Sequence, residues 1–214
     1  PLIARDTRVA NDVTVGPPGT FLLVTGSNMS GKSTLLRAIG VNAVLAQAGA
    51  PVCAATFRLP PVAIHTSMRV QDSLERGVSH FMAELERLKE IVSAARAAGT
   101  GERTVLYLLD EILQGTNTAE RQIAARRVID YLLSTGAIGA VTTHDLTLTD
   151  TPGLSRASHA VHFTETVRED DGRPVMTFDY VLRPGIATSV NALRLMRIIG
   201  LEGRSSLPSA TPPP

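Results

Sequence analysis

Tryptophan is absent from this 214-residue chain, and cysteine occurs once, as Cys53. A single thiol can form neither an internal disulfide nor a cysteine metal cluster, so the composition favours a reducing, cytosolic setting. A long apolar run is also missing. The longest one, residues 39–55, contains Asn42, Gln47, Gly49 and Pro51 and is too short to cross a bilayer. With no signal-peptide pattern either, we expect a soluble domain taken from a longer protein.

An excess of charge of either sign is missing too, since 21 Lys and Arg face 20 Asp and Glu, for a formal net charge of +1. Proteins that bind nucleic acid by bulk charge are more basic than this. Any DNA contact must therefore be local or made by regions outside this chain. Lysine is scarce, since only Lys32 and Lys89 accompany the arginines. The hydrophobic fraction of 43% is sufficient for a core.

Short apolar runs alternate along the chain with segments of helical periodicity. We expect strands at residues 21–25, 62–68, 104–109 and 137–141, and helices at residues 32–47, 79–98, 118–133 and 187–199. Residues 159–167 and 175–182 are expected to form an antiparallel pair around a turn at 170–172. This order predicts an α/β fold with a mainly parallel sheet flanked by helices. The Pro- and Ser-rich residues 201–214 are predicted to be disordered.

The helical segments also predict which side chains face inward. On 79–98 these are Phe81, Leu85, Leu88, Ile91 and Val92, and on 118–133 they are Ile123, Val128, Ile129 and Leu132. The charges typified by Glu84 and Lys89 are placed on a solvated face of the first helix.

Residues 26–33 match the pattern G-x-x-x-x-G-K-[ST] between a predicted strand and a predicted helix. Gly26 and Gly31 let the backbone turn successive N–H groups toward an anion, and the helix dipole adds positive potential. In such a loop Lys32 reaches the β- and γ-phosphates, and Ser33 is a ligand of Mg²⁺. The predicted nucleotide-binding residues are Gly26, Ser27, Asn28, Met29, Ser30, Gly31, Lys32, Ser33 and Thr34.

Two carboxylates follow the apolar strand predicted at 104–109. Asp110 and Glu111 fall at its carboxyl end, the sheet edge where ligands bind in open α/β sheets. Neighbouring residues on a strand point in opposite directions, so their roles should differ. We expect Asp110 to bind Mg²⁺ and Glu111 to polarise the attacking water. His144 follows the next strand at the same edge and is expected to sense the γ-phosphate.

These motifs together resemble the ATPase domain of the MutS family, the mismatch-repair ATPases of the ABC superfamily. The resemblance rests on residues 25–34 with their Asn28-Met29 pair, on 109–111 followed by 115–118 (Walker B and D-loop), on 142–144 (the His switch), on 77–85 (the signature segment) and on 184–189. It implies an ABC-type ATP- and Mg²⁺-dependent ATPase domain over residues 1–200. Residues 186–200 would begin a helical dimerisation element.

The resemblance also implies a homodimer with composite ATP sites. Ser79, at the start of the signature helix, would face the γ-phosphate of the partner subunit's ATP, and the helix N-terminus gives a physical reason for that contact. His80 stands where the family usually has Thr. Arg8 and Tyr180 are assigned to the adenine by their positions, since both side chains can stack on a purine. An exposed arginine and a tyrosine on a sheet face remain the alternatives.

The favoured function is therefore ATP-driven dimerisation that controls DNA-bound states, in the cytoplasm at the nucleoid. DNA, mismatched or branched, would be contacted mostly by regions outside this chain, and no membrane segment is expected within it. The first alternative is a MutS-like paralogue that acts on a target other than mismatches. A P-loop small-molecule kinase is disfavoured because few arginines follow the loop to form a lid. A module that binds ATP only to dimerise is disfavoured by the intact Glu111.

Overall fold

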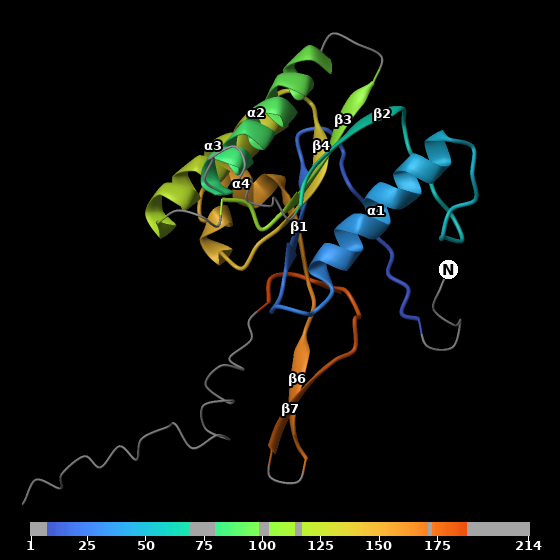
Figure 1. Ribbon diagram of the computed structural model, residues 1–214, viewed down its shortest axis with the longest axis vertical. Helices are drawn as coiled ribbons and strands as arrows, with labels where there is room; N and C mark the ends of the chain where they lie inside the picture. Colours follow the sequence, from blue (N-terminus) through green and yellow to red (C-terminus); the bar gives the residue numbers. More distant parts are fainter. Residues whose placement is uncertain (1–7, 69–79, 99–102, 114–116, 171–172, 188–214) are drawn as a thin grey trace, which may run out of the picture.

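The computed structural model describes residues 8–68, 80–98, 103–113, 117–170 and 173–187. Its helices are α1 (Lys32–Gln47), α2 (His80–Ala98), α3 (Thr118–Ser134) and α4 (Pro152–Ala157), with a 3₁₀ turn, η2 (Leu146–Thr149). Its strands are β1 (Phe21–Thr25), β2 (Val62–Ser67), β3 (Thr104–Asp110), β4 (Ile138–Thr142), β5 (Ser158–His162), β6 (Glu165–Asp170), β7 (Arg173–Phe178) and β8 (Arg183–Pro184). The predicted α/β fold with a mainly parallel sheet flanked by helices is confirmed (Figure 1).

Within the described residues, the main sheet has six strands in the order β2-β3-β4-β1-β5-β8. Its neighbouring strands run parallel except for β5 and β8. Strand β4 therefore lies between β1 and β3. This order matters for function because the carboxyl end of β4 is placed between the loop after β1 and the carboxylates after β3.

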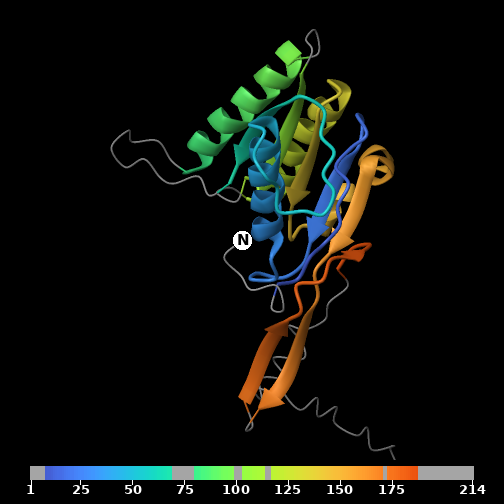
Figure 2. The same cartoon turned by 90° about the vertical axis from the view of Figure 1, so that its right-hand side faces the viewer.

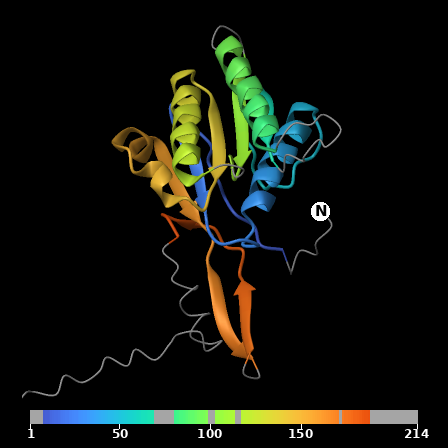
Figure 3. The same cartoon turned by 60° about the vertical axis from the view of Figure 1, so that its left-hand side comes forward.

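The two faces of the sheet are covered by different helices (Figures 1 and 3). Alternate residues of β1 and β3, such as Phe21 and Tyr107, pack with buried residues of α2 and α3, and the intervening ones, such as Leu22 and Leu108, pack with α1. Because both faces are buried, β1 and β3 are continuous apolar runs, as parallel strands in such a sheet require.

The predicted C-terminal strand pair is only partly correct. Residues 158–162 form β5, which pairs in parallel with β1 in the main sheet, and the antiparallel hairpin is β6–β7 instead. The strand predicted at 159–167 is broken after His162, and the antiparallel partner predicted to reach 182 ends at Phe178. The apolar pattern cannot distinguish one long strand from two short ones in different sheets. The hairpin extends away from the carboxyl edge of the main sheet (Figures 1 and 2).

Two predictions of helix facing are wrong. Ile123 is 55% exposed, because α3 turns Ala125, Ile129 and Leu132 toward the sheet. Glu84 is 3% exposed although it was assigned to a solvated face. Glu84 falls on the helical stripe of Leu88, Ile91 and Ala95, so it enters the core with them.

Several expectations lie outside the described residues. They concern residues 77–79 of the signature segment, including Ser79, and residues 115 and 116 of the D-loop segment. They also concern residues 188–199 of the helix predicted at 187–199, with most of the dimerisation element, and the tail at 201–214. His80 begins α2, which confirms the predicted helix there.

Candidate functional site

The loop after β1 has the backbone geometry of an anion-binding turn. Gly26, Met29 and Gly31 have φ angles of 137°, 67° and 110°, in the region that favours glycine. At Gly26 a Cβ would lie 2.9 Å from the carbonyl oxygen of Phe163 and 3.0 Å from Ser30 Oγ. Only glycine therefore fits at Gly26.

Two buried hydroxyls in this loop are unsatisfied. Within the described residues, the Oγ atoms of Ser27 and Ser30 have no hydrogen-bond partner, and Ser30 is only 1% exposed. A buried hydroxyl without a partner is costly, which indicates a site arranged for a polar ligand. The loop sits at the start of the 16-residue helix α1. Its amides and dipole suit a phosphate, so the residues present fit the phosphates of a nucleotide.

Lys32, in the first turn of α1, is 4% exposed. Its Nζ donates to the carbonyl oxygens of Gly26 at 2.9 Å and Ser27 at 3.0 Å, and it lies 3.3 Å from Glu111 Oε1. Burial lowers the pKa of Lys32, and the nearby carboxylates, Glu111 first among them, oppose that shift. The ammonium of Lys32 is thus held inside the loop by two backbone carbonyl oxygens and one carboxylate.

Glu111 and His144 meet over this ammonium. His144 Nε2 contacts Glu111 Oε1 and lies 3.5 Å from Lys32 Nζ. It also lies 2.8 Å from Oδ1 of Asn28 in the phosphate loop. Glu111 is 23% exposed and His144 41%, so both remain open to water. The structure brings together the loop lysine, the carboxylate and the histidine that the sequence assigned to one site.

Asp110 and Ser33 are the two residues predicted to bind a magnesium ion. Asp110 ends β3, and its Oδ1 accepts a hydrogen bond of 2.6 Å from Thr142 Oγ1. The charge of Asp110 also raises the pKa of Lys32, with a smaller effect than that of Glu111. Ser33 is half-buried at the start of α1. A carboxylate and a hydroxyl are hard oxygen ligands of the kind that Mg²⁺ takes alongside nucleotide phosphates.

The two residues assigned to the adenine come from opposite ends of the chain. The ring of Tyr180 is 48% exposed and stacks on Phe178, with Cδ1 3.5 Å from where a Cβ on Gly31 would lie. Asn11, three residues after Arg8, donates to the Tyr180 carbonyl and accepts from the Leu182 amide. The tyrosine therefore lies beside the phosphate loop, next to the segment that carries the exposed Arg8.

Sequence reasoning missed Glu84 and the hydroxyl of Thr142 as parts of this site. Glu84 Oε1 accepts from the backbone amide of Leu113 at 2.6 Å, which ties α2 to the segment after Glu111. For Glu84 the signal was its phase with the apolar stripe of α2. For Thr142 it was its place at the end of a buried strand, two residues before His144.

A family model described as MutS domain V matches residues 22–204. The chain belongs to the MutS family. It is 34% identical over 207 residues to "Endonuclease MutS2" of Thermomicrobium roseum, which covers 94% of this chain and 24% of that protein. It is 38% identical over 198 residues to "DNA mismatch repair protein MutS 2" of Halobacterium salinarum, covering 90% of this chain and 21% of the relative. It is also 31% identical over 204 residues to "DNA mismatch repair protein MutS" of a Streptococcus pneumoniae strain, covering 94% of this chain and 23% of that protein.

The MutS-family chain thus spans about a quarter or less of the length of these curated relatives. The region that matches MutS domain V contains the phosphate loop, Asp110, Glu111 and His144. Among the described residues, none of the helices has the length and apolar character needed to cross a membrane.

Proposed function

We propose that this MutS-family chain binds and hydrolyses ATP with Mg²⁺, through an ABC-type ATPase site. The observation that supports this most strongly is the convergence of Lys32, Glu111 and His144 at the phosphate loop. A structural ion pair would not require a glycine-only loop with two unsatisfied serine hydroxyls beside it. Each of these features serves an anionic ligand.

The residues divide the chemistry among them. Loop amides and Lys32 hold the β- and γ-phosphates, and the Lys32 ammonium exchanges its carbonyl partners for phosphate oxygens. Glu111 polarises a water that attacks the γ-phosphorus, the bond to the β–γ bridging oxygen breaks, and the proton passes toward Glu111. His144, held beside Asn28 and Glu111, contacts the γ-phosphate and so reports its presence.

Ser33 and Asp110 are the residues that would hold the magnesium ion. The ion supplies charge neutralisation at the β- and γ-phosphates when it is bound. Tyr180 and Arg8 would flank the base on the outer side of the loop.

Hydrolysis would take place in a homodimer and would be coupled to DNA. Ser79 of one subunit would complete the site of the other, as the family resemblance implies. The relatives are named as DNA mismatch repair proteins and as an endonuclease, so DNA is the target we propose. Regions beyond this chain would choose the DNA structure, and the protein would act in the cytoplasm at the nucleoid.

The test is the variant Glu111→Gln. It should keep ATP binding and lower the hydrolysis rate by about two orders of magnitude, as loss of a general base does. Phosphate release and nucleotide titration measure the two quantities. Glu86→Gln, which changes an exposed carboxylate on α2, is the matched control and should leave both unchanged. Turnover of Glu111→Gln near that of the control would mean that the base lies elsewhere.

A further inference from the structure

The side chain of Thr142 joins the two carboxylate residues of the site. Thr142 is the last residue of β4 and has no exposed surface. Its Oγ1 donates to Asp110 Oδ1 at 2.6 Å and accepts from the backbone amide of Glu111 at 3.1 Å. The same amide also lies 3.1 Å from the Thr142 carbonyl oxygen. One buried hydroxyl therefore contacts both residues that the reaction needs at the end of β3, Asp110 and Glu111.

The direction of these bonds fixes what the hydroxyl does. A hydroxyl has one proton, and here the Glu111 amide occupies a lone pair of Oγ1, so the proton is directed at Asp110. Donation to Oδ1 orients the Asp110 carboxylate. Asp110 thereby keeps a fixed orientation before any cation arrives.

The backbone at Glu111 explains why such a support is needed. Glu111 has a φ angle of 52°, which is unfavourable for a residue with a side chain. This conformation directs the chain out of β3 so that Glu111 reaches Lys32 and His144. The carbonyl and hydroxyl of Thr142 hold the amide of this strained residue from one side.

We propose that Thr142 is a positioning residue of the ATPase site, which orients Asp110 for the magnesium ion and holds Glu111 in its strained conformation. This inference rests on the proposed function. The sheet order places β4 between β1 and β3, so a strand-end hydroxyl reaches the Asp110 carboxylate and the Glu111 backbone amide.

Thr142→Val tests it, because valine keeps the branched shape and replaces the hydroxyl with a methyl group. We expect at least a tenfold lower kcat at saturating ATP and Mg²⁺, and a several-fold higher Mg²⁺ concentration for half-maximal rate. ATP binding measured without Mg²⁺ should be unchanged. Thr142→Ser, which restores the hydroxyl, should recover most of the wild-type rate.

A second readout does not depend on turnover. In the nucleotide-free protein, amide hydrogen exchange of Glu111, followed by NMR, should be several-fold faster in Thr142→Val than in the wild type or in Thr142→Ser. The amide then keeps only the Thr142 carbonyl oxygen of its two acceptors. If Thr142→Val does not fold, Thr142→Ala is measured in the same way against Thr142→Ser.

The inference is overturned if the hydroxyl-free variant matches the wild type in kcat, Mg²⁺ dependence and Glu111 exchange. It is also overturned if Thr142→Ser is as impaired as that variant. Either result leaves the proposed function standing when the wild type hydrolyses ATP. A wild type that neither binds nor hydrolyses ATP would overturn the proposed function, and the inference with it.

Discussion

The Lys32 ammonium is buried and has three hydrogen-bonding or charged partners. Two are backbone carbonyl oxygens of the loop, and the third is the Glu111 carboxylate. An ammonium has three donors, so these partners satisfy it without a nucleotide. At the scale of the residue, binding ATP is an exchange of partners around a charge that is already desolvated. Because the exchange requires a protonated ammonium, nucleotide binding depends on the protonation of Lys32.

Nucleotide affinity should depend on pH through Lys32. Burial lowers its pKa below the ordinary 10.5, and bound phosphates add negative charge that raises it again. Binding therefore takes up a proton at alkaline pH, and affinity should fall by up to about tenfold per pH unit once the pH exceeds the lowered pKa. Isothermal titration calorimetry with ADP between about pH 7 and 10, below the ordinary pKa of a lysine side chain, measures this effect.

Lys32→Arg is the control for that titration, because arginine keeps its charge throughout the range. Its affinity, whatever its absolute value, should lack the alkaline decline. A parallel decline in both proteins would assign the effect to another group. In the nucleotide-free wild type, the unfolded chain holds more protons on Lys32 between the lowered pKa and 10.5. This group therefore makes the free energy of unfolding rise with pH across that window.

The sequence was informative at the residue scale where a motif fixes the backbone. Gly26, Gly31 and Lys32 could be assigned because the phosphate loop requires those residue types at that spacing. Glu84 could not be assigned in the same way, because a charged side chain on a helix is solvated by default. Its burial depends on where the backbone amide of Leu113 lies, which only the packed structure shows.

Close packing between neighbouring strands places the site at the scale of the element. Gly139 in β4 pairs with Tyr107 in β3, and a Cβ at Gly139 would lie 2.3–2.4 Å from the Tyr107 ring. The ring is fully buried between the sheet and the helices on that face. The small residue in β4 thus lets the ring lie across the strand that delivers Thr142 and His144.

Gly139→Ala should destabilise the fold by about 1–3 kcal/mol, because the added methyl overpacks the site against an aromatic ring. Thermal unfolding should show a drop in Tm of roughly 2–4 °C for each kcal/mol. Gly153→Ala is the matched control, since a Cβ there meets nothing within 4 Å and α4 favours alanine. Equal Tm values for the two variants would contradict the packing argument.

The elements themselves were predictable to different degrees. The buried strands and the long helices follow from apolar runs and helical periodicity, and their bounds agree closely with the structure. The strands after residue 157 do not follow from such local patterns. Strands β5 and β6 are separated only by Phe163 and Thr164, yet they belong to different sheets. Partner choice between strands is a long-range property that local patterns do not carry.

On the scale of the whole molecule, the chain is one domain-sized part of the proteins it resembles. It spans about a quarter or less of its relatives, and the β6–β7 hairpin extends from the sheet edge that carries the site (Figure 2). If the proposed site is shared between subunits, activity depends on assembly. Specific ATPase activity should then rise with protein concentration.

Mixing two inactive variants should restore hydrolysis. Lys32→Ala removes the phosphate contact of a subunit's own site, and Ser79→Ala removes its contribution to the partner's site. Each homodimer is defective at both sites, but one site of the heterodimer is intact. The mixture should recover part of the wild-type rate, measured as phosphate release. With heterodimers shown to form, a mixture as inactive as its components would mean that Ser79 does not act in trans.

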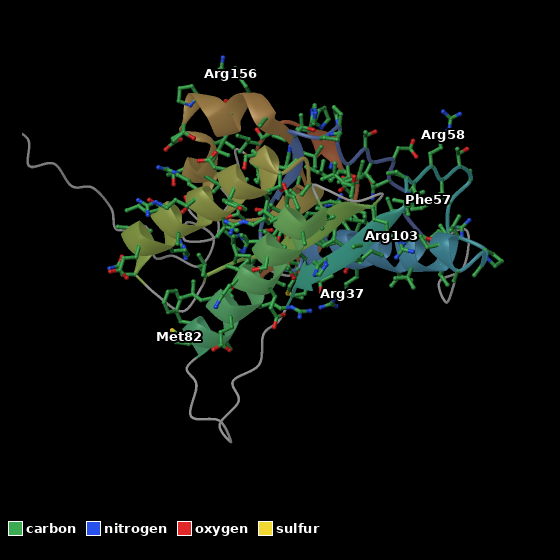
Figure 4. All side chains as sticks on the ribbon, turned by 90° about the horizontal axis from the view of Figure 1, so that it is seen from above. Arg37, Phe57, Arg58, Met82, Arg103 and Arg156 are labelled. Carbon is green, nitrogen blue, oxygen red and sulfur yellow. The ribbon has the colours of Figure 1, made fainter. Side chains whose placement is uncertain are left out.

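The central claim is that residues 26–34 bind the phosphates of ATP, and the most direct measurement is a nucleotide titration of Lys32→Ala. Arg37→Ala is its control, because Arg37 is an exposed basic residue on the same helix (Figure 4). We predict that Lys32→Ala, folded as judged by circular dichroism, binds Mg·ATP at least 100-fold more weakly than the wild type, because its charge-assisted phosphate contacts are lost. Arg37→Ala should bind as the wild type does. Unchanged affinity in Lys32→Ala would contradict the account.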